Sequence, residues 1–230
     1  MRARTLTLLV LWLVLPLWGC GDDDPGFAPP PGAGLVALDD RPAVEITAPL
    51  LRVQWRLPGD PEPKFSHIYS DPLSDGDIAF NPRTFLYTIS MEPRMLLFGI
   101  DRADPDLPEY RAFLDFPLDI IPLDAQIDFA SVEVFVLAVN YSAVIPTFLD
   151  LVQYDLFGLT PQDFDSDPFL FRTLEFFSTD QGAYVEIDVT PLMKEAQKRS
   201  FAEFQVRFLV DFTRAILSPE PPAKAPEGVR

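Results

Sequence analysis

The chain has 230 residues, 18 of them basic and 35 acidic, which gives a formal net charge of -17 at neutral pH. A surface this acidic repels phosphate backbones and anionic headgroups, so nucleic acid is not an expected partner and a basic membrane-binding patch is not expected either. A single cysteine and a single histidine exclude a disulfide framework and a zinc site built from several such ligands.

The N-terminus has the parts of a secretory signal peptide. Arg2 and Arg4 form a positive segment, residues 6–17 are almost wholly apolar, and Gly19 precedes Cys20. We therefore predict a signal peptide over residues 1–19. An uncleaved helical anchor is the less favoured alternative, because the apolar run is shorter than the ~20 residues that a membrane span prefers.

The segment Leu17-Trp18-Gly19-Cys20 resembles the lipobox of bacterial lipoproteins, although Trp18 replaces the small residue usual there. The resemblance implies that Cys20 is diacylated and becomes the first residue of the mature protein, which two acyl chains then anchor stably to a membrane. It also implies export to the cell envelope. The acidic residues 22–24 resemble a tag for the outer face of the outer membrane, with an ordinary solvated spacer as the alternative.

Composition divides the remainder into three parts. Residues 20–42 are rich in acid, proline and glycine and are predicted to be a tether, able to hold a domain up to roughly 60 Å from the bilayer. Residues 219–230 are rich in proline, alanine and charge and are predicted to be disordered. Residues 43–218 are left for one folded domain.

Within that domain the apolar residues recur at the period of two that is typical of β-strands. The clearest strands are residues 51–57 and 202–212, and residues 132–139 are apolar on both faces, as in a central strand. Shorter strands are expected at residues 65–69, 85–91, 95–100, 110–116, 148–154, 174–177 and 184–189, and residues 70–83 are expected to form a loop.

One helix is predicted outside the signal peptide, at residues 190–196, where Thr190 is placed to cap and Pro191 occupies the first helical position. About ten strands, one short helix before the last strand, and no β-α-β alternation predict an all-β fold. We expect an antiparallel β-sandwich of the jelly-roll type.

Several segments, in this order, resemble the DNRLRE-type jelly-roll domains. Residues 95–100, 110–118 and 130–136 resemble the first half of those domains, and residues 185–192 and 204–208 resemble their step into a short helix and their closing strand. Some members of the family resemble carbohydrate-binding modules for acidic polysaccharides, so the resemblance implies an exported protein with a carbohydrate-binding role. The tryptophan motifs usual in the middle of the family are absent.

The residues do not favour catalysis. His67 is the only histidine and lies in a predicted strand, and the chain has no Gly-x-Ser-x-Gly elbow. Among 35 acidic residues, sequence spacing does not single out a glycosidase pair. We predict that the protein is not an enzyme.

Calcium is the one metal ion for which the sequence contains a candidate binding motif. Asp163, Asp165 and Asp167 place carboxylates at alternate positions, as loops that bind hard cations do. Pro168 and Leu174 exclude an EF-hand. The two interpretations are a structural Ca²⁺ and, as the better supported one, solvated turn acids. No cofactor is required.

For ligand binding the best candidates are Tyr184 and Glu186, which share the polar side of their predicted strand with Asp188. Trp55 and Tyr110 fall on apolar faces and are expected in the core. The leading hypothesis is that the sandwich binds a polysaccharide or other surface glycan. The alternative is a structural or assembly component that docks another envelope protein through a sheet face or edge.

Overall fold

The computed structural model describes residues 42–91, 95–155 and 158–215. Cys20, the predicted signal peptide, the predicted tether up to residue 41 and the predicted tail over residues 219–230 lie outside the described residues. Within the described ranges, no helix is long and apolar enough to cross a membrane.

The described chain consists almost entirely of β-strands. They are β1 (Ala43–Arg56), β2 (Lys64–Tyr69), β3 (Gly76–Asn81), β4 (Leu86–Met91), β5 (Leu96–Ile100), β6 (Glu109–Pro117), β7 (Gln126–Asn140), β8 (Val144–Val152), β9 (Leu170–Phe177), β10 (Tyr184–Asp188) and β11 (Glu203–Val210). Two short α-helices, α1 (Thr190–Lys198) and α2 (Phe212–Ala215), flank β11, and single 3-10 turns lie at Pro161–Asp163 and Ser178–Asp180.

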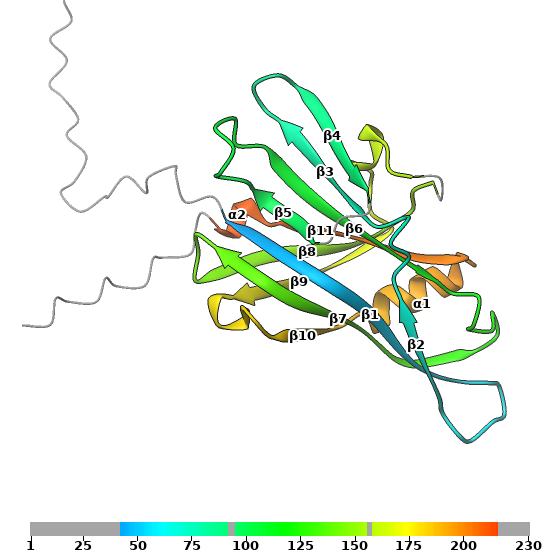
Figure 1. Ribbon diagram of the computed structural model, residues 1–230. Helices are drawn as coiled ribbons and strands as arrows, with labels where there is room; N and C mark the ends of the chain where they lie inside the picture. The colour runs from blue at the N-terminus through cyan, green and yellow to red at the C-terminus, as the bar shows by residue number, and fades with distance from the viewer. Residues whose placement is uncertain (1–41, 92–94, 156–157, 216–230) are drawn as a thin grey trace, which may run out of the picture. The chain divides into compact units, whose positions relative to one another are not determined.

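The strands pair antiparallel and form two layers (Figure 1). The first sheet has the order β10-β7-β1, with β2 and β5 on the other edge of β1. The second sheet has the order β9-β8-β11-β6-β3-β4. Strand β5 joins the sheets, because it pairs with β1 and, through Gly99 and Ile100, with β6. The chain crosses repeatedly between the layers, as in jelly rolls.

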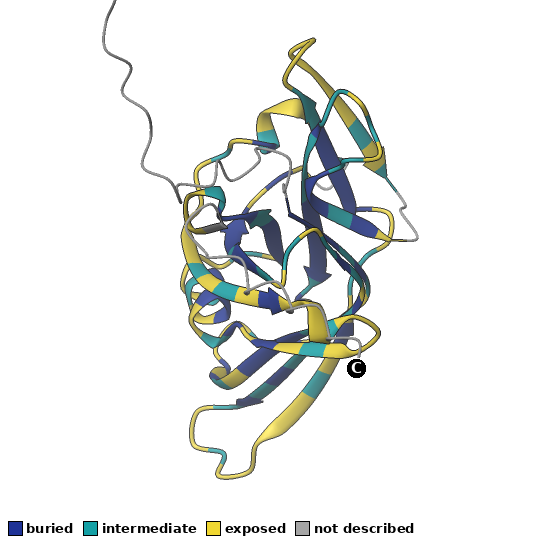
Figure 2. Ribbon diagram, turned by 90° about the vertical axis from the view of Figure 1, so that its left-hand side faces the viewer, coloured by how far each residue is buried: buried dark blue, intermediate teal, exposed yellow. Residues whose placement is uncertain are grey.

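The main core lies between the two sheets. Inward positions alternate with outward ones on β1 and β7, so buried residues recur at every second position from Leu51 to Trp55 and from Val132 to Val136, whereas the middles of β6 and β11 are buried on both faces (Figure 2). At its centre the rings of Phe98, Phe176 and Phe208 pack together, with the Phe98 centroid 5.3 Å from that of Phe208 and 5.6 Å from that of Phe176. Helix α1 adds Leu192, Met193 and Ala196 to the same core.

A second, smaller core covers the outer face of the second sheet. It consists of Ile78, Phe113, Val152, Tyr154, Leu159 and Phe164. These residues come from β3, β6, the end of β8 and the segment that leads to β9. The centre of the second sheet is therefore buried on both faces, whereas its edge strands β4 and β9 and the outer face of the first sheet keep exposed side chains.

The predicted all-β antiparallel sandwich, with one short helix before its last strand, is confirmed. The loop expected at residues 70–83 is wrong in part, because Gly76–Asn81 form β3 between β4 and β6. Glycine and asparagine at the ends of this strand, and the aspartate before it, are residues typical of turns. Pairing with β4 and β6 nevertheless makes the segment a strand. Gly76 is required there, since a Cβ atom would lie 2.6 Å from the Ser90 carbonyl oxygen. The last strand ends at Val210 rather than Phe212, which begins α2.

We predict that Phe98→Ala destabilises the domain by about 3–5 kcal/mol, because it leaves a cavity among fully buried rings. Chemical denaturation followed by tryptophan fluorescence measures this change. Phe65→Ala makes the same truncation at an exposed site and should change the free energy of unfolding by less than about 0.5 kcal/mol. Equal effects of the two variants would contradict the assignment of the core.

Candidate functional site

The outer face of the first sheet is the best candidate for a binding site. We call it the open face and define it by these residues of β1, β2, β7 and β10: Arg52, Gln54, Phe65, His67, Tyr69, Phe129, Ser131, Glu133, Phe135, Tyr184, Glu186 and Asp188. The register sets them in rows, since residues directly opposite each other share a face. One row across the sheet is His67, Arg52, Ser131 and Asp188.

The centre of the open face is polar and ordered by side-chain contacts. Arg52 Nη2 donates to both carboxylate oxygens of Glu133 at 2.9 Å, and Ser131 Oγ donates to Glu186 Oε1 at 2.7 Å. Glu133 and Glu186 lie directly opposite on β7 and β10, an arrangement that is unfavourable for like charges. The guanidinium of Arg52 offsets that repulsion. Its Nε is buried and has no hydrogen-bond partner among the described residues.

A shallow hollow lies over this polar centre. Its volume is about 210 Å³, and its lining includes Arg52, Phe65, His67, Ser131 and the predicted ligand-binding residue Glu186. Phe65 is 69% exposed at its wall. The hollow therefore combines an apolar wall with hydroxyl, carboxylate and guanidinium groups.

Exposed aromatic rings lie at both ends of the open face. Phe65 and Phe129 lie at the end nearer the β1–β2 turn. Tyr184, the other predicted binding residue, lies at the opposite end, is 61% exposed, and packs edge-on against Phe135 at 5.0 Å between ring centroids. Phe129 and Phe135 are six residues apart on β7, which corresponds to about 20 Å. Tyr184 does not line the hollow but extends the same face beyond it.

Sequence reasoning found two of these residues and missed the others. Tyr184 and Glu186 stand out because they alternate with buried residues on a short strand. The polar side of β1 gave a signal through Arg52 and Gln54, but only the pairing of β1 with β7, about 80 residues away, brings Arg52 to Glu133. Trp55 is buried as predicted, while Tyr110 is only half-buried.

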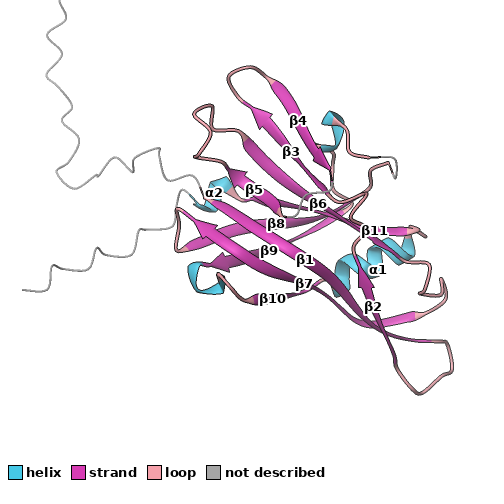
Figure 3. Ribbon diagram, in the orientation of Figure 1, coloured by secondary structure: helices cyan, strands magenta, loops and turns pink. Residues whose placement is uncertain are grey.

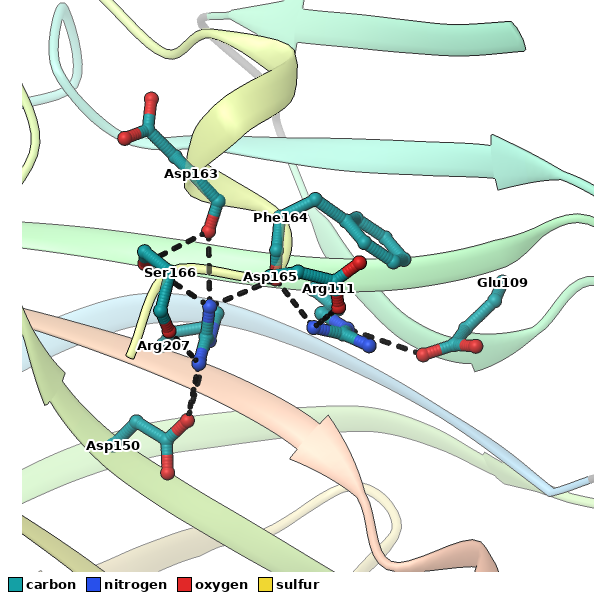
Figure 4. A network of polar contacts seen from close by, with 8 residues as sticks. All are labelled: Glu109, Arg111, Asp150, Asp163, Phe164, Asp165, Ser166 and Arg207. Carbon is teal, nitrogen blue, oxygen red and sulfur yellow. Dashed lines mark hydrogen bonds and ion pairs between the residues drawn. The ribbon is translucent and has the colours of Figure 1, made fainter. Parts of the chain in front are cut away.

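The acidic loop predicted as a possible calcium ligand set is organised around two arginines (Figure 4). Arg207, on β11, donates to the carbonyl oxygens of Asp163, Phe164 and Ser166 at 2.9, 2.7 and 2.9 Å. Arg111, on β6, donates to the Phe164 carbonyl and to Asp165 Oδ1 and stacks on the Phe164 ring. The backbone carbonyl oxygens of this loop thus already accept hydrogen bonds from the guanidinium groups of Arg111 and Arg207.

The three carboxylates of the loop do not converge. Asp163 Oδ2 accepts from the backbone N–H and hydroxyl of Thr160, and Asp165 pairs with Arg111. Asp167 joins neither of these contacts. Within the described ranges, no three His, Cys, Asp or Glu side chains form a group that could hold a metal ion. The calcium interpretation of Asp163, Asp165 and Asp167 gains no support from this geometry.

Arg207 is also half of a buried ion pair. Its Nη2 lies 2.6 Å from Asp150 Oδ2 on β8, and the two side chains are only 3% and 6% exposed. Burial raises the pKa of Asp150, and the hydrogen bonds and charge of Arg207 act in the opposite direction. The pair therefore holds an ionised carboxylate and a guanidinium away from water beneath the loop.

A separate group of acids lies where β6 and β11 meet the β2–β3 loop. Asp75 accepts from the backbone N–H of Asp115 at 2.9 Å and from Ser70 Oγ at 2.5 Å, and Gln205 Nε2 donates to Asp115 Oδ2 at 3.1 Å. Burial raises the pKa of Asp75 to about 7. Burial also raises the pKa of Glu203 to about 7, with further contributions from the charge of Asp115 and the hydrogen bond to it.

No family model, curated protein or solved structure matches this chain. The assignment of the site therefore depends on its geometry alone.

We predict that Arg207→Met destabilises the domain by about 3–5 kcal/mol, because it leaves the Asp150 carboxylate buried and unpaired. Combining it with Asp150→Leu should recover much of that loss, since the double variant removes both charges. Urea denaturation of the two variants measures the difference. A double variant less stable than Arg207→Met alone would contradict the account of the ion pair.

We also predict that the domain loses stability as the pH rises from about 4.5 to about 7.5. Asp75 and Glu203 titrate near 7 when folded, and burial raises the pKa of Asp77 to about 6, all above their ordinary values of 3.8 to 4.5. The folded state therefore binds more protons across this range and is favoured at its acidic end. Urea midpoints at pH 5 and pH 8 measure the effect.

The control for this pH dependence is Asp75→Asn, in which the amide oxygen can still accept from the Asp115 N–H. It should reduce the pH dependence without abolishing it, because Asp77 and Glu203 keep their raised pKa values. A wild-type midpoint that rises between pH 5 and pH 8 would show that the acids are not protonated in the folded state.

Proposed function

We propose that the protein is a non-catalytic, lipid-anchored component of the cell envelope that binds a neutral glycan on its open face. The observation that carries the proposal is a polar, hydrogen-bonding centre with exposed aromatic rings at both of its ends. A pyranose ring has an apolar face of C–H groups and a rim of hydroxyls, so it needs a flat ring beneath it and paired donors and acceptors beside it. Both kinds of group are present here.

The aromatic rings supply the apolar part of this recognition. Phe65, Phe129 and Tyr184 remain exposed although their sheet has a well-packed inner face. Contiguous exposed apolar groups mark interaction sites, and Phe65 and Phe129 lie on either side of Gln54 in one row of the sheet. Their separation along the sheet suits an extended chain of several sugars rather than a single compact ligand.

The polar centre would set the orientation of the ligand. Arg52, Ser131 and Glu186 are held by contacts with one another and with Glu133, so their orientation is set before a ligand arrives. His67 lies beside Arg52 in the same row.

The charge of the open face favours a neutral glycan over an acidic one. Arg52 is paired with Glu133, and Asp188 lies 3.8 Å from Arg172. Glu186 adds a further negative charge, and the whole chain is strongly acidic. An acidic polysaccharide would meet repulsion here.

The same contacts support binding without catalysis. Glu133 and Glu186 face each other across the sheet, as the two acids of a glycosidase would. A glycosidase needs acids that are free to act on the substrate, but both carboxylate oxygens of Glu133 are already engaged by Arg52. We therefore propose recognition rather than hydrolysis.

Anchoring through Cys20 completes the proposal. The lipobox resemblance supports a diacylated N-terminus in the cell envelope, with the outer membrane as the proposed location. A tether over residues 20–42 would let the domain reach a glycan away from the membrane surface. Such a protein would link the membrane to a polysaccharide.

A second candidate function is docking of another envelope protein at the edge of β4. Within the described chain β4 pairs only with β3, and it lies at the rim of its sheet (Figure 3). Phe85 and Leu86, beside the β3–β4 turn, are exposed. An unpaired edge with apolar neighbours can add a strand from a partner.

We predict that the purified full chain binds a neutral polysaccharide on a glycan array and in a pull-down with insoluble polysaccharides. Phe65→Ala and Tyr184→Ala should each weaken binding by about tenfold, since each removes a ring that packs against the ligand. Runs with calcium and with a chelator test whether a cation takes part.

Phe171→Ala is the matched control, because it truncates an exposed ring on β9 of the other sheet and should leave binding unchanged. If a folded protein binds no glycan with or without calcium, the glycan proposal fails. Cross-linking in intact cells, with a charged substitution at Leu86, would then test the β4 edge.

A further inference from the structure

A second concave site lies at one end of the sandwich, away from the open face. We call it the end pocket, and its volume is about 250 Å³. The loop between β6 and β7, helix α1 and the start of β11 enclose it. Its lining residues are Leu118, Asp119, Ile121, Pro122, Leu123, Met193, Gln197, Phe201, Ala202 and Glu203.

Backbone and side-chain hydrogen bonds hold the walls of the end pocket. The N–H of Leu118 donates to the Ala202 carbonyl at 3.0 Å, which joins the β6–β7 loop to the segment before β11. From α1, Gln197 Nε2 donates to the carbonyls of Ala125 at 2.6 Å and Leu123 at 3.3 Å. The pocket is therefore formed before any ligand binds.

The end pocket is apolar over most of its surface. Leu118, Ile121 and Met193 are buried in its floor, and Leu123 is exposed at its rim. Ile120, next to the lining, is also exposed. Apolar groups at the rim as well as the floor suit a ligand with a hydrocarbon or aromatic body.

The polar end of the pocket is acidic. Glu203 and Asp119 line it, and the Glu203 carboxyl is hydrogen-bonded to Asp115 behind it. None of the described residues that line the pocket is basic. Arg199, near the end of α1, lies 2.7 Å from Glu195 and stacks on Phe169, so it is engaged elsewhere.

We propose that the end pocket binds a small amphiphile with an apolar body and a protonated amine. The body fills the space among Leu118, Ile121 and Met193. The ammonium group donates to Glu203 and lies near Asp119, which supplies the positive charge that the lining lacks. A cation offered to partly buried carboxylates forms stronger hydrogen bonds than a neutral donor.

The titration of Glu203 supports this choice of ligand. Its pKa of about 7 reflects burial and the negative charges that face it, Asp115 on β6, Asp119 on the β6–β7 loop and Asp71 on the β2–β3 loop. A bound ammonium group would favour the ionised form of Glu203 and lower that pKa. Amine binding should therefore be stronger at pH 8 than at pH 5.5.

The test uses phenethylamine as the probe and the full chain as the receptor, with calorimetry and saturation-transfer NMR as readouts. Phenethyl alcohol and 3-phenylpropionate are matched in their apolar part but carry a neutral and a negative group. We expect the amine to bind at pH 8 at least about tenfold more tightly than either comparator. Glu203→Gln should weaken amine binding by about tenfold and remove its pH dependence.

Glu62→Gln is the control, because it removes one exposed carboxylate of the β1–β2 turn and should leave binding unchanged. Asp119→Asn, on an exposed loop position, gives a second test should Glu203→Gln fail to fold. Equal binding of amine and alcohol, no amine binding, or full binding by both pocket variants would overturn the proposal. This site is separate from the open face, so failure here leaves the glycan proposal unaffected.

Discussion

The buried guanidinium of Arg207 makes it possible for the centre of the second sheet to be covered on both of its faces. Buried backbone carbonyls need donors, and the loop from Asp163 to Ser166 has three of them pointing at the sheet. Arg207 supplies donors to all three and is neutralised by Asp150 on the neighbouring strand. Phe164 can then enter the second core beside Phe113, with Arg111 stacked on its ring.

This covering determines where a ligand can bind. The segment between β8 and β9 covers the centre of the outer face of the second sheet, which leaves exposed side chains on its edge strands β4 and β9, whereas the first sheet keeps an outer face with a continuous row of polar and aromatic side chains. There, Arg52 and Glu133 form an ion pair that remains partly exposed, in contrast to Arg207 and Asp150. An arginine–carboxylate pair thus stabilises packing on one sheet and presents hydrogen-bonding groups to solvent on the other.

The sequence predicts strands well where apolar and polar residues alternate clearly. It fails to predict a strand that forms only because neighbouring strands pair with it. The alternation in β11 and the Thr190-Pro191 start of α1 are local signals, and both elements form. Strand β11 nevertheless ends at Val210, and Thr190 is the first helical residue after the N-cap Val189 rather than the cap. Strand β3 has no such signal, because Asp77 is a buried polar residue that resembles part of a turn. The aspartates at 163, 165 and 167 resemble a cation loop by spacing, but the arginines that satisfy the loop come from residues 111 and 207. Contacts between residues this far apart in the chain cannot be predicted from one sequence.

The position of β2 explains why the open face has a wall on that side. Strand β2 is an edge strand that pairs only with β1 in the described chain, so hydrogen bonds on one side are all that its backbone gains from the sheet. Two side-chain contacts add to them. Ile68 points into the core, and the indole Nε1 of Trp55 donates to Ser66 Oγ at 3.0 Å. Trp55 itself belongs to the main core, so this hydrogen bond joins β2 to the core. Because Phe65 and His67 alternate with Ser66 and Ile68, fixing the inward pair orients the outward pair. The core tryptophan therefore sets the position of the aromatic wall that faces the ligand, although it does not reach the open face itself.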